Sequence, residues 1–326
     1  MQDQDRSPHA GLTALCGLFM GMAVAAMPGT ASARDLFGAE AFSTYAGDPD
    51  NGRYLANAAG CLGCHASAND AGNPAGGARI DSYTGTVFVP NITSHPNGVG
   101  GFSNADYLNA VINGISPDGR HYLPMYPYGA YAGMKPEDVL DIKAYIATLA
   151  PSDNKPPAHE ISFPYNTNFF WAMWKRGNFD TPAFQPGDET QMSRGRYLAE
   201  NVGACGECHT PRTMDYGLDT KRPLQGEIAL TGDAAPAITP DVIASAGSQS
   251  FVENFLENGT RLSGSAFAST IKTHMTEGLG LLTEDDRLAL TAYLTGQKQV
   301  PEKPEMETEA SCKADAPGGP VPASGL

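Results

Sequence analysis

Two stretches of this 326-residue chain carry cysteine and histidine in the same five-residue pattern. The first stretch is NAAGCLGCHASA and the second is NVGACGECHTPR. The side chains concerned are Cys61, Cys64 and His65 in the first, and Cys205, Cys208 and His209 in the second. A Cys-x-x-Cys pair alone could be a redox dithiol or half of a zinc site, but a histidine directly after it indicates attachment of c-type haem.

Haem attachment needs these residue types at this spacing. Each thiol adds across one vinyl group of the porphyrin and forms a thioether, and two intervening residues place both sulfurs on one helical turn. The adjacent imidazole then becomes the proximal ligand of the iron. A shared zinc site would require the two patterns to meet at one metal, and a redox dithiol would be expected in a βαβ context that the sequence lacks. We therefore predict two covalently bound haem c groups.

The repeat extends well beyond the cysteines, and repeats are a strong guide to architecture. GRYLANAAGCLGCH begins at Gly52 and GRYLAENVGACGECH at Gly195; PNITSHP is matched downstream by PAITPDV. Apolar residues at helical spacing follow in ADYLNAVINGIS and SFVENFLENGTR, and each copy closes with a helical segment, KPEDVLDIKAYIATL or TEDDRLALTAYL. Aligning AYI with AYL gives an offset of 148 residues. We predict an all-α fold of two tandem modules, residues 37–150 (the first half) and 191–300 (the second half).

The remaining segments differ in composition. Residues 151–190 form a linker rich in proline and aromatic residues, including SFPYNTNFFWAMWKRGNF, whose aromatic side chains we expect to pack between the halves. Residues 301–326 are predicted to be a disordered tail, and Cys312 within it could be a free thiol. The net charge of −15 excludes a nucleic-acid-binding surface and could steer the protein toward a basic partner.

The N-terminus predicts export. Residues 10–27 carry no charge and are followed by the small-x-small pattern ASA at 31–33, so we expect residues 1–33 to be a cleaved signal peptide. The 18-residue run could alternatively stay as an anchor. Cys16 lies within it and is not predicted to be lipidated. The mature protein is expected in the periplasm, with at most a peripheral membrane association.

Over residues 48–300 the sequence resembles the dihaem cytochrome c subunits of periplasmic dehydrogenases, which accompany alcohol, gluconate, nicotinate and related molybdenum-containing enzymes. The resemblance rests on GRYLANAAGCLGCH, VPNITSHPNGVGGFSNADYLNAVINGISPDGRHYLP, PYGAYAGMKPEDV, FPYNTNFFWAMWKRGNF and CGECHTPR. It implies two cytochrome c domains with one haem each. It also implies a non-enzymatic protein that takes electrons from a molybdenum or quinoprotein dehydrogenase subunit and passes them to a downstream acceptor. The alternative is a dihaem enzyme such as a thiosulfate dehydrogenase or a peroxidase, which needs an open or unusually ligated iron.

Each iron has one further axial position, which cytochromes c commonly fill with methionine. For the first haem the resemblance favours Met134, with Met125 as the alternative and His121 as a weaker third candidate. For the second haem, Ile271 stands where the family carries methionine, so we predict Met275, with His274 or an absent ligand as the alternative.

Four further side chains attract attention near these patterns. The resemblance implies that Pro211 lies beside the second haem and that Arg212 contacts a propionate or a backbone carbonyl. A surface position for Arg212 is the alternative. Tyr54 and Tyr197 are expected to pack the first helix of each half.

Overall fold

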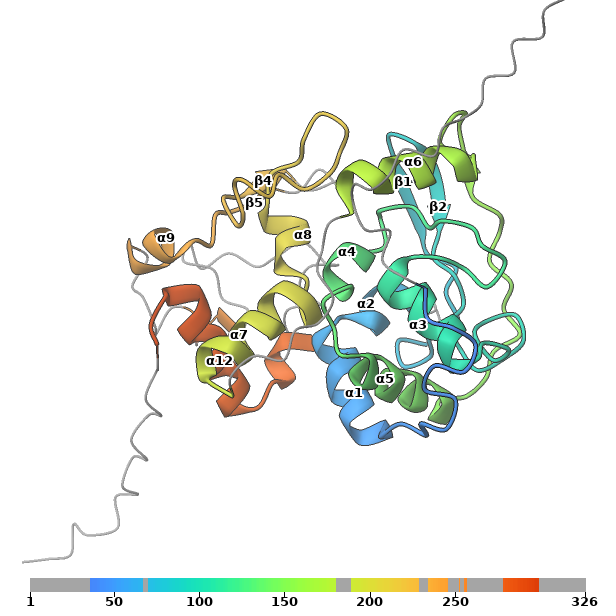
Figure 1. Cartoon of the computed structure of the whole chain (residues 1–326), viewed down its shortest axis with the longest axis horizontal. Helices are drawn as coiled ribbons and strands as arrows, with labels where there is room; N and C mark the ends of the chain where they lie inside the picture. The colour runs from blue at the N-terminus through green and yellow to red at the C-terminus, as the bar shows by residue number, and fades with distance from the viewer. Residues whose placement is uncertain are drawn as a thin grey trace, which may run out of the picture. The chain divides into compact units, whose positions relative to one another are not determined.

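The computed structural model describes residues 36–66, 70–179, 189–228, 234–245, 252, 255–256 and 278–298 (Figure 1). The predicted signal peptide, the tail, Cys16 and Cys312 lie outside these residues, as does most of the segment around SFVENFLENGTR. The described part is mostly helical. Within it, no helix is both long enough and apolar enough to span a bilayer.

The first half contains five helices in its described residues. They are α1 (Pro49–Ala58), α2 (Cys61–His65), α3 (Asn104–Asn113), α4 (Tyr128–Tyr131) and α5 (Pro136–Thr148). Local chemistry explains their starts. Ser103 and Asp106 form a reciprocal capping box at α3, and Pro136 occupies the first turn of α5, where its missing N–H costs nothing.

The described residues of the second half follow a similar order, except that α9 has no helical counterpart in the first half. Helix α7 (Gln191–Tyr197) runs into a π-helical turn (Leu198–Val202), and α8 (Cys205–His209), α9 (Pro240–Ser245) and α12 (Glu284–Thr295) follow. A 3-10 turn (Leu279–Leu281) precedes α12, whose N-cap Thr283 accepts a hydrogen bond from the Asp286 backbone N–H. Between the halves, the linker forms helix α6 (Asn168–Asn178), capped by Thr167.

Two small sheets depart from the all-α prediction. Strands β1 (Arg79–Ser82) and β2 (Gly85–Phe88) form an antiparallel hairpin, joined by β3 (Glu160–Ile161) from the linker. Strands β4 (Glu227–Ile228) and β5 (Ala234–Ala235) pair in the second half. Gly85 has a φ of +127°, and a Cβ there would lie 2.2 Å from the Glu160 carbonyl oxygen, so the close approach of β3 requires glycine. Strands this short leave little periodicity in the sequence.

The first and last helices of each half pack against each other at a matched glycine. Helix α1 packs on α5 and α7 packs on α12 (Figure 1). A Cβ at Gly52 would lie 1.8 Å from the Asp141 carbonyl oxygen, and one at Gly195 would lie 1.9 Å from that of Ala289. Both glycines belong to the repeated GRYLA segment, so the duplicated sequence encodes the same close helix crossing twice.

One apolar core runs through both halves. It includes Leu55, Leu108 and Ile142 from the first half and Val202 and Leu290 from the second, each at most 5% exposed. Burial of this continuous apolar surface holds the halves together.

Candidate haem-binding sites

Helices α2 and α8 each form a single helical turn that carries one attachment pattern. Each begins after a residue in the left-handed conformation, Gly60 (φ +68°) or Ala204 (φ +48°). The two cysteines of each turn are three residues apart and therefore lie on one face. All four are free thiols, and Cys64 and Cys208 are exposed. Both pairs are thus able to form thioethers on one side of a short helix.

The two histidines are oriented by the same contact in both halves. The Nδ1 atom of His65 lies 2.8 Å from the Pro90 carbonyl oxygen, and that of His209 lies 2.7 Å from the Pro236 carbonyl oxygen. Because a carbonyl oxygen only accepts, Nδ1 must carry the proton, which leaves the Nε2 lone pair free for a metal. Pro90 and Pro236 open the matched PNIT and PAIT segments, so a second repeated motif orients the ligand of the first.

Burial determines the protonation of these groups. It raises the pKa of the Cys61 and Cys205 thiols to about 12, with a further contribution from the second cysteine of each pair. It also lowers the pKa of both histidines, against the smaller opposing effect of the proline carbonyls. Redox dithiols depend on a lowered thiol pKa, whereas a neutral imidazole is the form that binds iron. Two thiols and one neutral imidazole fit haem attachment better than dithiol exchange.

The arrangement of the side chains does not support the alternative of a shared zinc site. Across the described ranges, no group of three or more His, Cys, Asp and Glu side chains is gathered as a metal-ion site requires. The two Cys-x-x-Cys pairs do not converge into one shared tetrahedral site.

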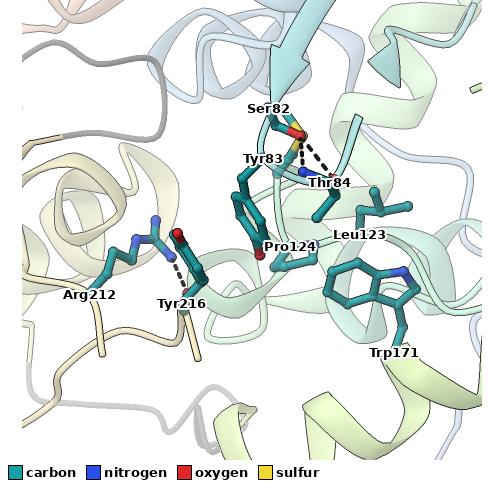
Figure 2. Close-up of a pocket in the computed structure, with 9 residues that line it drawn as sticks. Ser82, Tyr83, Thr84, Leu123, Pro124, Trp171, Arg212 and Tyr216 are labelled. Atoms are coloured by element: carbon teal, nitrogen blue, oxygen red, sulfur yellow. Dashed lines mark hydrogen bonds between the residues drawn. The ribbon is translucent and has the colours of Figure 1, made fainter. Parts of the chain in front are cut away.

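The candidate sixth ligands fall in different surroundings. Met134 is 1% exposed, in the core just before α5. Met125 is half-buried before α4. It lines a small cavity together with Tyr83 and Trp171, and these two residues are labelled in Figure 2. Met275 and His274 lie outside the described residues. His121 is half-buried rather than on the surface. Its backbone N–H donates to the Asn168 side chain, and its pKa is lowered by burial and by the Lys175 charge.

Arg212 is a largely buried residue whose side chain makes several hydrogen bonds. Its Nη2 donates to the Glu207 carboxylate at 2.7 Å and to the Glu207 carbonyl at 2.8 Å. Its Nη1 donates to the Tyr216 carbonyl at 3.4 Å (Figure 2). The Arg212 and Glu207 side chains are only 12% and 17% exposed. Contact with a backbone carbonyl, one of the two predicted roles, is therefore present, and the surface alternative is wrong. Pro211 is buried beside it.

The linker contacts both halves, as its aromatic residues predict. Tyr83 of the first half stacks on Tyr216 of the second, with ring centroids 3.9 Å apart, and Tyr165 meets Tyr83 edge-on. The Trp174 indole N–H donates to the Asp215 carbonyl at 2.7 Å. The prediction fails for Phe163 and for Phe169 of α6, which are 81% and 77% exposed.

The second attachment helix lies against α4 of the first half. The Asn201 side chain donates to the Ala130 carbonyl at 3.0 Å, and a Cβ at Gly129 would lie 3.6 Å from Glu207 Oε1. Glu207 is one of the two residues between Cys205 and Cys208. The first half therefore packs directly on the segment that carries the second Cys-x-x-Cys-His pattern.

The structural roles of two groups of residues were not predicted from the sequence. Lys175 of α6 is buried, with Nζ donating to the Asn113 and Gly114 carbonyls, and nothing in WKRGNF marks it as buried. Tyr54 and Tyr197 pack as predicted but also form hydrogen bonds from one half to the other. The only hint of this shared role in the sequence was that both tyrosines occupy the same position in the repeated GRYLA segment.

Two Cys-x-x-Cys-His helices, each with an imidazole oriented by a backbone carbonyl, are typical of a c-type cytochrome. Residues 49–150 match the family model for cytochrome c. The chain is also similar to a diheme cytochrome c-type protein of Cereibacter sphaeroides, at 36% identity over 274 residues that cover 80% of this chain and 89% of that protein. The chain belongs to the cytochrome c family, and the prediction of an electron-transfer protein rather than an enzyme is confirmed.

Longer relatives carry dehydrogenase names. The chain is 33% identical over 261 residues to the fructose dehydrogenase cytochrome subunit of Gluconobacter japonicus, covering 78% of this chain and 53% of the relative. It is 30% identical over 293 residues to the cytochrome c subunit of the quinone alcohol dehydrogenase of Gluconacetobacter polyoxogenes, covering 81% and 62%. The chain thus spans less than two thirds of the length of these two subunits.

Proposed function

We propose that this protein is a periplasmic dihaem cytochrome c that accepts electrons from the catalytic subunit of a dehydrogenase and delivers them to a downstream carrier. The observation that carries the proposal is the duplicated attachment site. In both halves, two free thiols and a histidine share one helical turn, and the histidine Nδ1–H donates to a proline carbonyl. Two equivalent haem-binding sites in one chain would allow single electrons to pass from one haem to the other.

In this proposal each half, residues 37–150 and 191–300, is one cytochrome c domain with its own haem. Cys61 and Cys64 would hold the first haem and Cys205 and Cys208 the second, with His65 and His209 as proximal ligands. A bound haem supplies one-electron oxidation and reduction of its iron. The chain's contribution is to hold each imidazole as the neutral Nδ1–H tautomer.

The repeat supports a choice between the two methionines of the first half. The offset of 148 residues places Met134 in register with Leu282, and both are buried immediately before the N-cap of the last helix. A leucine cannot ligate iron, so this position serves core packing in the second half. The register therefore favours Met125 over Met134. For the second haem, Met275 remains the proposed ligand and His274 the alternative.

The partner is inferred from the names of the relatives. Fructose dehydrogenase and quinone alcohol dehydrogenase have cytochrome subunits similar to this chain. We propose a dehydrogenase of the quinoprotein or molybdenum type as electron donor. The packing of α8 against α4 supports transfer between the two sites within one chain, because it brings the second attachment segment onto the first half.

Haem quantification tests the proposal. Protein exported by cells that mature c-type cytochromes is expected to carry two irons per chain, to keep its red pigment in acid–acetone, and to titrate reversibly by one electron per haem. In the oxidised spectrum, a methionine-sulfur charge-transfer band that persists in cyanide is expected. Extractable pigment, or zinc in place of iron, would refute the haem assignment. Rapid turnover of thiosulfate or peroxide by the isolated chain would refute the electron-relay role.

The axial ligand is tested by two matched variants. Met125→Leu is expected to remove the charge-transfer band of one haem, and Met134→Leu to retain it, because leucine already occupies the equivalent buried position in the second half. The reverse outcome assigns the iron to Met134.

A further inference from the structure

Two tyrosines at the same place in the repeat each reach into the opposite half. Tyr197 donates to Asp138 Oδ2 at 2.6 Å and accepts the Lys135 backbone N–H at 3.1 Å. Tyr54 donates to Asp286 Oδ2 at 2.5 Å, and its hydroxyl also accepts the backbone N–H of Thr283 at 3.2 Å. The same two bonds are therefore made twice, in opposite directions.

The bonded groups have equivalent positions at the two helix starts. Lys135 is the N-cap of α5 and Thr283 is the N-cap of α12, and the carboxylates of Asp138 and Asp286 belong to the third residue of each helix. In an ordinary capping box the carboxylate at the third position accepts the N-cap N–H directly.

Helix α3 shows that ordinary form in this chain. The Ser103 backbone N–H donates straight to Asp106 Oδ2 at 3.0 Å. At α5 and α12, a phenol hydroxyl from the other half is inserted between donor and acceptor. It accepts the N-cap N–H and donates to the carboxylate, so each half bridges the N-cap N–H to the third-residue carboxylate in the other half. At α12 the Thr283 side chain adds the second bond of the capping box, whereas Lys135 of α5 makes no side-chain cap.

Burial and charge make these contacts strong. Tyr197 and Asp286 are each 7% exposed, and hydrogen bonds to carboxylates are stronger than neutral ones. Burial, together with the neighbouring carboxylates, raises the pKa of both Tyr54 and Tyr197, so both hydroxyls keep their protons as donors. Arg194 donates to both oxygens of Asp286, at 2.8 and 2.7 Å; despite burial, these bonds and that of Tyr54 hold the pKa of Asp286 below its usual value.

We propose that Tyr54 and Tyr197 are reciprocal positioning residues: each first helix holds the start of the other half's last helix in place. Helix α5 packs on α1, which leads into the attachment helix α2, and α12 packs on α7, which leads through the π-helical turn into α8. Each tyrosine thus sets the start of a helix that supports the attachment site of the opposite half. The hydrogen bonds alone carry this reciprocity, and only its effect on haem potential rests on the proposed function.

Hydrogen exchange on the full haem-loaded chain tests the crossing, because phenylalanine removes only the hydroxyl. In Tyr197→Phe, amides of 135–139 are expected to exchange about tenfold faster, as for loss of one hydrogen bond to a charged group, while 283–287 are unchanged. Tyr54→Phe is expected to give the reverse pattern. Tyr293→Phe is the matched control, since its hydroxyl bonds Glu200 at 2.6 Å within the second half, and it should alter neither segment.

The test depends on which half of the chain shows faster amide exchange. Acceleration confined to the half that carries the substitution, equal acceleration in both segments, or no acceleration overturns the reciprocal role. A spectroelectrochemical titration supplies the second readout. Each tyrosine variant is expected to shift one of the two haem potentials, and Tyr293→Phe neither; unshifted potentials in both variants overturn the positioning role. A crossed exchange pattern in protein lacking two haems would support the reciprocal role of the tyrosines and refute the proposed function. Two haems without the crossed pattern would support the proposed function and refute the reciprocal role.

Discussion

The buried lysine of the linker predicts a specific dependence of stability on pH. Lys175 is 7% exposed; its Nζ donates to the Asn113 carbonyl at 2.8 Å and the Gly114 carbonyl at 2.6 Å, and lies 4.2 Å from the centroid of the Tyr128 ring. These carbonyls end helix α3, where the helix dipole favours a positive charge. Burial nevertheless lowers the pKa of Lys175 to about 7.

The sign of the effect follows from proton binding in the two states. In the unfolded chain the lysine keeps a pKa of about 10.4, so between about pH 7 and pH 10 the unfolded state binds more protons. The free energy of unfolding therefore rises with pH across that window, and it is independent of this group below about pH 7. One group gives at most about 1.4 kcal/mol per pH unit, or roughly 5 kcal/mol over the whole window.

Urea unfolding of wild type and Lys175→Met measures this slope. Methionine keeps a long apolar stem and removes the titrating amine. The difference in unfolding free energy between wild type and variant is expected to rise by about 1 kcal/mol per unit between about pH 7 and pH 9. Taking the difference cancels the titration of tyrosines and other groups that both proteins share.

A second lysine provides the control. Lys143 also donates to a backbone carbonyl, that of Phe102 at 2.8 Å, but it is half-buried, and its pKa is lowered less than that of Lys175. Lys143→Met is therefore expected to change the pH slope less than Lys175→Met. Equal slopes for wild type and Lys175→Met would show that the buried amine does not titrate in this window, and would refute the reasoning.

Three further predictions concern the attachment sites and their support. Cys208→Ala should lower covalently held haem from two per chain toward one, measured as iron against protein; an unchanged ratio contradicts the assignment. Gly195→Ala should destabilise by about 1–3 kcal/mol or more in thermal unfolding, because its Cβ would lie 1.9 Å from a carbonyl oxygen; Gly177→Ala in helix α6, whose Cβ meets no described atom within 4 Å, should not destabilise. Arg212→Met should destabilise the protein by about 1–3 kcal/mol or more near neutral pH, because it leaves the largely buried Glu207 carboxylate without this partner. Burial already raises the pKa of Glu207 against the opposing effect of this arginine, so the loss should shrink as pH falls and the carboxyl protonates; a loss independent of pH would argue against this cause.

The attachment chemistry could be predicted from the sequence because it is local. Two thiols and an imidazole must lie within one helical turn, so their spacing identifies them without a fold. The helices ending each half were predicted for a similar reason, since periodicity, Pro136 and Thr283 mark their starts. The strands were not predicted, because segments of two to four residues carry almost no periodic signal.

Contacts between distant segments could be decided only by the tertiary structure. His65 is oriented by Pro90, 25 residues away, and Lys175 is buried because α6 lies against the end of α3. Both contacts depend on which segments approach each other.

The two tyrosines of the repeat show most clearly which features follow from the sequence and which depend on the tertiary structure. Duplication placed Tyr54 and Tyr197 in identical surroundings along the chain, and that much the sequence by itself determined. Whether each hydroxyl meets its own half or the other depends on how the two halves pack. Only the folded chain brings Tyr54, 232 residues away in sequence, to Asp286, because burial of apolar surface shared by both halves drives that approach.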